Sequence, residues 1–166
     1  MTKLTTFVIS VFLIVLSGCA APGSNTPLVE YQEVIEFDSE IDKSTLFNRT
    51  RLWLAEAFVD SKEVIELEDK EAGLLVGNGG MEYTFPLVPA MPGQFSLRID
   101  IKDGKLRTTY SNFKIYHSGS QYSSGGWSAV REGTANGYPE QSIQAAQRLN
   151  ANLKKFVQQA EADDDW

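Results

Sequence analysis

Residues 94–117, QFSLRIDIKDGKLRTTYSNFKIYH, hold the strongest structural signal in this chain. In the first arm, apolar and polar side chains alternate, with Phe95, Leu97, Ile99 and Ile101 on one face and Ser96, Arg98, Asp100 and Lys102 on the other. This period of two is typical of a strand with one buried and one solvated face. Asp103-Gly104 is the two-residue signal of a tight hairpin turn, so residues 105–117 form the returning strand. The stretch therefore predicts part of an antiparallel sheet.

The segments on either side complete a small α+β domain. Strands are expected at residues 29–37, 63–69 and 73–85, the last with a bulge or bend at Asn78–Gly80. An amphipathic helix is expected over 45–61, capped by Asp42 or Ser44, and a second helix begins at Pro139. The three prolines of FPLVPAMPG, residues 85–93, predict a loop. The order β-α-β-β-β-β-α predicts a two-layer domain in which both helices cover one face of the sheet.

The N-terminal leader predicts an exported and lipid-anchored protein. Its apolar run from Phe7 to Leu16 is too short for a membrane span of roughly 20 residues, and Pro22 and Gly23 soon follow. The junction Leu16-Ser17-Gly18-Cys19 resembles the lipobox of bacterial lipoproteins, in which the cysteine is acylated and becomes the new N-terminus. That resemblance implies lipidation of Cys19, and Ala20 in place of Asp implies delivery to the outer membrane. An uncleaved anchor helix is the alternative.

Four regions follow from this interpretation. We expect a signal peptide at 1–18, a lipidated tether at 19–28, the α+β domain at 29–160 and an acidic tail at 161–166. Removal of Lys3 with the signal leaves 14 basic and 22 acidic residues, a net charge of −8. Such a charge disfavours nucleic acid and anionic lipid surfaces as non-specific partners. Because the only cysteine would be acylated, no disulfide or cysteine metal site is expected.

Two blocks of the sequence resemble a known domain family. These are LFNRTRLWLAEAFVDSKEVIELEDKEAGLLVGNG, residues 46–79, and LRIDIKDGKLRTTYSNF, residues 97–113. They resemble a bacterial family of unknown function described as having a TATA-binding-protein-like fold, and the resemblance covers Ile35 to Tyr116. It implies a β-α-β4-α fold, the order that the residue patterns also predict. It implies no activity, no cofactor and no catalytic residues.

The sequence offers little catalytic chemistry. His117 is the only histidine, so a zinc site of His and Cys ligands cannot be assembled, and no motif joins His117 to a nucleophile and an acid. Asp100 and Asp103 are better explained by a strand face and a turn than by a cation site. We expect no metal, no cofactor and no enzymatic activity.

The segment from His117 to Tyr138 shows no clear periodicity and is long for a loop. It combines Ser and Gly with large aromatic residues. Adaptable backbone with large rings suits binding, although Tyr122 and Trp127 could equally fold back onto the core. The predicted contact surface comprises Arg98, Asp100, Arg107, His117, Tyr122 and Trp127. The chain is thus expected to be a periplasmic binding module whose partner is another envelope protein or peptidoglycan. A small-molecule or lipid carrier, with a cavity lined by Trp53, Phe58 and Phe95, and an envelope-acting hydrolase are the alternatives.

Overall fold

The computed structural model describes residues 26–37, 41–58, 65–134 and 137–162. The predicted signal peptide, Cys19, tether residues 20–25 and tail residues 163–166 lie outside the described residues. The elements, in chain order, are β1 (Tyr31–Glu36), α1 (Lys43–Ala57), β2 (Ile65–Asp69), β3 (Leu74–Phe85), β4 (Val88–Lys102), β5 (Lys105–His117), β6 (Gly126–Ala129) and α2 (Tyr138–Ala162). No helix in the described ranges is long and apolar enough to span a membrane.

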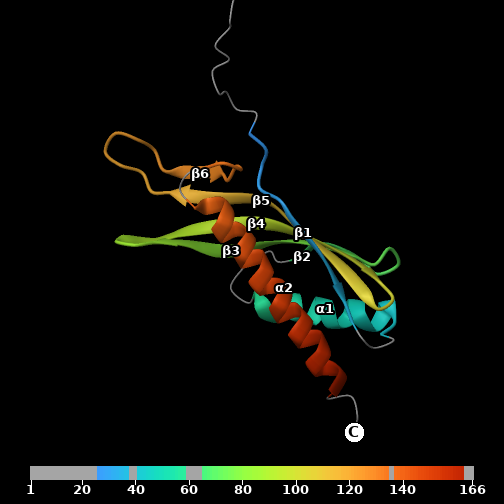
Figure 1. The fold of residues 1–166 in the computed structure, drawn as a ribbon. Helices are drawn as coiled ribbons and strands as arrows, with labels where there is room; N and C mark the ends of the chain where they lie inside the picture. Colours follow the sequence, from blue (N-terminus) through green and yellow to red (C-terminus); the bar gives the residue numbers. More distant parts are fainter. Residues whose placement is uncertain (1–25, 38–40, 59–64, 135–136, 163–166) are drawn as a thin grey trace, which may run out of the picture.

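One antiparallel sheet organises the molecule, in the strand order β1-β5-β4-β3-β2, with β6 added beside β5. Both helices lie on the same side of this sheet (Figure 1). The two-layer α+β prediction is confirmed, including the hairpin at Asp103–Gly104, which joins β4 to β5 with Lys102 paired to Lys105. β6 is a sixth strand that the sequence patterns did not predict.

The core fills the space between the sheet and the helices. The predicted inner face of β4 is buried throughout, and so is the apolar stripe of α1 around Phe47 and Trp53. Asp42 is the N-cap of α1, as predicted, because its carboxylate accepts hydrogen bonds from the backbone N–H groups of Ser44 and Thr45. Trp53 donates from Nε1 to Oδ1 of Asn152, 2.7 Å away, and so joins α1 to α2.

The proline-rich segment 85–93 is not a loop, contrary to expectation. Only Pro86 and Leu87 form the turn, because Phe85 pairs with Val88 and β4 continues from there. Residues 88–92 of β4 pair with β3 but lie beyond the part of β4 that pairs with β5. A strand with one free side tolerates residues that lack an N–H donor, so Pro89 and Pro92 are accommodated.

The expected bulge at Asn78–Gly80 is also wrong. The pairing of β3 with β4 runs without a break through these residues. Gly79 faces the core, where a Cβ atom would come within 2.4 Å of the Phe95 ring and 2.8 Å of the Phe58 ring. The glycine therefore makes room for two aromatic rings, and no bulge interrupts the pairing there.

The described residues 117–134 contain more regular structure than their composition suggests. Residues 126–129 form β6 against the end of β5, and a small bridge joins Ser120 to Ser123. The chain then meets the N-terminal segment, where the Thr26 and Pro27 carbonyls accept hydrogen bonds from Arg131 and Glu132. The last residues assigned to the tether are thus bonded to the domain next to β6.

Candidate functional site

The face of the sheet that points away from the helices is covered by no helix of the described chain (Figure 1). Its side chains come from the polar positions of β4 and β5 and from their partners on β1, β2 and β3. Cross-strand register arranges them in rows: Val76, Arg98, Thr109 and Gln32 form one row, and Leu74, Asp100, Arg107 and Val34 form the next. Period-two alternation in each strand puts all of them on the outer face.

Arg98, Asp100 and Arg107 form one ionic group on this face. The Asp100 carboxylate accepts from Arg98 at 2.6 Å on one oxygen and from Arg107 at 3.0 Å on the other. The hydrogen bond from Arg98, with that from Arg107, holds the pKa of the Asp100 carboxyl below its usual value although partial burial opposes this. The hairpin register causes the arrangement, since Asp100 lies directly opposite Arg107. Two predicted site residues, Arg98 and Arg107, therefore both contact a third, Asp100.

A row of polar hydrogen bonds crosses the sheet beside this group. Asn78 donates to Glu66, Ser96 donates to Asn78 at 2.9 Å, and Asn112 donates to Ser96 at 3.3 Å. Asn112 has a positive φ of 53° where the register of β4 and β5 shifts, a conformation that Asn tolerates better than most residues. These bonds span β2 to β5 and fix the side chains of the open face in place.

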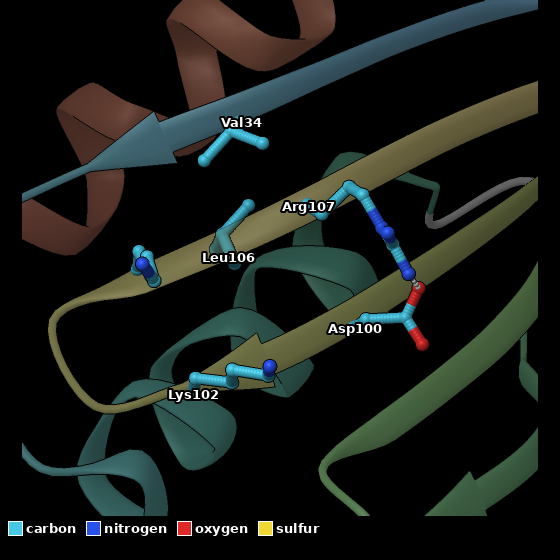
Figure 2. A pocket seen from close by; sticks show the side chains of 6 residues that line it. Val34, Asp100, Lys102, Leu106 and Arg107 are labelled. Carbon is cyan, nitrogen blue, oxygen red and sulfur yellow. Dashed lines mark hydrogen bonds and ion pairs between the residues drawn. The ribbon is translucent and has the colours of Figure 1, made fainter.

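A shallow hollow of about 180 Å³ lies at the turn end of this face. It is lined by Val34, Asp100, Lys102, Lys105, Leu106 and Arg107, and Figure 2 shows Arg107 reaching across to Asp100 beside it. No hydrogen bond or ion pair joins the ammonium group of Lys102 or Lys105 to another residue in the described ranges. Since Asp100 is already paired with two guanidinium groups, the hollow has a cationic rim and suits an anionic group.

The other three predicted site residues lie at the opposite end of the sheet. His117 ends β5, Tyr122 lies at the tip of the β5–β6 connection, and Trp127 stands on β6 opposite Tyr116, with ring centroids 5.3 Å apart. Tyr116 is the ninth residue after Arg107 along β5, a distance of about 30 Å at roughly 3.3 Å per residue. The structure thus divides the predicted contact surface into two groups, one central and one at the end.

The residues of the two alternative functions are placed as follows. Trp53, Phe58 and Phe95, which would line a carrier's cavity, pack edge to face against one another at centroid distances of 5.8 and 6.1 Å. His117 is exposed, and no other described residue hydrogen-bonds its imidazole. Within the described ranges, no three His, Cys, Asp or Glu side chains gather closely enough to hold a metal ion.

Several residues of the open face were not predicted from the sequence as part of the contact surface. Val34 and Lys105 line the hollow, and Leu87 and Val88 project from the β3–β4 turn. For Lys105 a signal was present, because a two-residue Asp-Gly turn places it opposite Lys102. For Leu87 there was none, because the proline-rich segment was assigned to a loop.

Comparison with known proteins gives a family and a fold. A family model described as a domain of unknown function (DUF4468) with TBP-like fold matches residues 31–116. A solved TBP-like protein from Parabacteroides distasonis ATCC 8503 superposes with a TM-score of 0.64 and 12% identity, covering 79% of this chain and 93% of its own. A DUF4468 family protein from Bacteroides ovatus ATCC 8483 superposes with a TM-score of 0.59 and 9% identity, covering 78% of this chain and 86% of its own. None of the functionally curated proteins matches the sequence.

Proposed function

This chain belongs to the DUF4468 family of TBP-like domains, and we propose that it is a lipid-anchored binding module of the cell envelope. Its anchor is an acylated Cys19, and its contact surface is the open face of the sheet. The partner is another envelope protein with an acidic contact surface. The domain binds and does no chemistry of its own.

The anchor is supported by the sequence around Cys19. A short apolar run ends in Leu16-Ser17-Gly18-Cys19, which resembles a lipobox, and Ala20 follows where Asp would favour the inner membrane. Each buried methylene contributes about 0.8 kcal/mol, so two or more acyl chains give stable attachment. The protein then resides at the outer membrane with its domain in the periplasm.

One observation carries the proposed binding role, namely that the helices cover only one face of the sheet. The other face presents side chains that are already fixed by hydrogen bonds, among them Arg98 and Arg107 on Asp100. Fixed side chains lose little entropy when a partner docks, which favours specific recognition. Beside them, exposed Val34 offers apolar contact and Lys102 and Lys105 offer positive charge. This combination favours an acidic partner surface.

Site-specific photo-crosslinking in the native organism tests the binding role. A photoreactive residue replaces Thr109, which lies between Arg98 and Gln32 on the open face. The control replaces Glu56, an exposed residue of α1 on the other side of the molecule. We expect a discrete protein adduct at position 109 and none at 56.

The adduct should also depend on the charges of the face. Substitution of Lys102 and Lys105 by Gln should weaken it, whereas Lys154→Gln with Lys155→Gln, the same charge change on α2, should leave it unchanged. Equal capture at positions 109 and 56, or capture of glycan strands at 109, would contradict the proposed protein partner.

A further inference from the structure

Exposed apolar side chains gather at one end of the sheet. Of the eight large exposed hydrophobic residues in the described ranges, four lie there: Leu87, Val88, Tyr122 and Trp127. Leu87 lies in the β3–β4 turn and Val88 begins β4, while Tyr122 lies in the β5–β6 connection and Trp127 on β6. Register places these tips together, because Gly93 of β4 pairs with Ile115 of β5 and His117 pairs with Gly126. Figure 1 shows both connections projecting at the same end.

The β3–β4 turn exposes a leucine where the backbone favours glycine. Leu87 has a φ of 65° and directly follows Pro86, in the position of a turn that Gly or Asn normally occupies. The side chain is fully exposed, at 105%, and so gains no burial in the described chain to offset that conformation. Tyr122 is similarly exposed, at 89%, on a tip closed by the Ser120–Ser123 bridge. Two separate tips thus present apolar side chains that are not buried in the domain.

The N-terminal segment enters the domain beside the end of β6, about level with Phe113 of β5, where Val29 is hydrogen-bonded to Val130 and Val130 to Phe113. Thr26 and Pro27 are hydrogen-bonded to Arg131 and Glu132, just after β6. Between Cys19 and Thr26 there are only the six residues 20–25, which span at most about 25 Å when extended and about 15 Å as a flexible chain. A lipid on Cys19 would therefore hold β6 and the sheet edge beside it close to the bilayer, with the β5–β6 connection nearby.

We propose that the Leu87 and Tyr122 tips, with Trp127 behind them, rest on the lipid surface to which Cys19 attaches the chain. This inference relies on the lipid anchor of the proposed function and adds a second, non-covalent membrane contact that orients the domain. Aromatic and aliphatic side chains suit the bilayer interface, where Trp and Tyr are enriched. The net charge of the mature chain, −8, repels anionic lipid, so the contact depends on apolar burial and should be insensitive to salt.

A depth-sensitive fluorescence experiment tests this orientation. Because Cys19 is the only cysteine and would be acylated, Leu87→Cys or Tyr122→Cys gives the mature lipidated protein a single reactive thiol. Each variant is labelled with the fluorophore NBD and reconstituted into phosphatidylethanolamine–phosphatidylglycerol vesicles, with or without nitroxide-labelled lipid. The matched controls are Leu67→Cys, an exposed apolar position on β2, and Glu56→Cys on α1.

We expect nitroxide lipid to quench NBD at positions 87 and 122 by about twofold, and to affect positions 67 and 56 little. The quenching should persist in high salt. Equal quenching at all four positions, or none at 87 and 122, would overturn the inference. A change in NBD fluorescence at positions 87 and 122 that occurs without vesicles and grows with protein concentration would show that the tips contact a second copy of the chain. That result would also overturn the inference.

The mass of the purified protein separates this inference from its premise. If Cys19 carries no acyl chains, the anchor of the proposed function fails. If the acyl mass is present while positions 87 and 122 remain unquenched, the anchor stands and only the orientation is wrong.

Discussion

At the scale of single residues, buried hydrogen bonds attach α2 to the sheet. Tyr83 and Ser142 are both fully buried, and their hydroxyl oxygens lie 2.9 Å apart. Burial raises the pKa of the Tyr83 phenol above its usual value, so this group stays neutral at any physiological pH. Tyr110 donates in the same way to Asn150, 2.8 Å away. These pairs fix the position of α2 along the sheet, which apolar contacts alone would leave less defined.

Removal of one partner of such a pair should cost more than removal of both. Ser142→Ala leaves the Tyr83 hydroxyl buried without a partner and should lower the free energy of unfolding by about 1–3 kcal/mol. In the double variant with Tyr83→Phe, much of that loss should be recovered. Urea denaturation measures both, with Ser128→Ala on exposed β6 as the neutral control. Equal losses in the single and double variants would show that the hydrogen bond does not position α2.

At the scale of elements, strong local patterns were enough to predict most of the fold. The alternation of β4 and the Asp103–Gly104 turn each specify a hairpin locally, and the capping carboxylate of Asp42 specifies the start of α1. The first residues of β4 could not be found this way, since their prolines are tolerated only because that stretch lacks a neighbour on the β5 side. β6 has just four residues and is defined by backbone pairing with β5, which leaves no periodicity to detect.

The two adjacent glycines of β3 should respond very differently to substitution. Gly79→Ala would place a methyl group against the Phe95 and Phe58 rings, and such overpacking should cost about 1–3 kcal/mol. Gly80→Ala meets no atom within 4 Å and should change stability by less than about 0.5 kcal/mol. Thermal unfolding of the two variants checks this. Similar losses of stability for both variants would mean that Gly79 is needed for its backbone flexibility, and not for the space that it leaves to the Phe95 and Phe58 rings.

At the scale of the whole molecule, the candidate site could be predicted only in part. Arg98, Asp100 and Arg107 belong to one hairpin, so its register brings them together. His117, Tyr122 and Trp127 were assigned to the same surface, but the length of β5 keeps them apart from that group. The sequence pattern indicates which side chains share a face of the sheet. It does not indicate which residues of that face lie close enough together to contact one partner.

The separation of the two groups suggests how the parts of the molecule cooperate. The apolar tips lie at one end of the sheet, the N-terminal segment joins the domain beside β6, and the ionic group lies further along the open face. An anchored domain whose tips rest on lipid would hold this open face away from the bilayer. The face would then be turned toward the periplasm and accessible to a protein partner.

Thiol accessibility in the intact envelope tests whether the open face is occupied there. Thr109→Cys and Glu56→Cys are each introduced into the full chain, and their rates of maleimide labelling are compared between the native envelope and the purified protein. We expect position 109 to react several-fold more slowly in the envelope and position 56 to react at the same rate in both. Equal rates at position 109 in the two preparations would contradict the account, because a binding module in its own compartment should have its contact face covered.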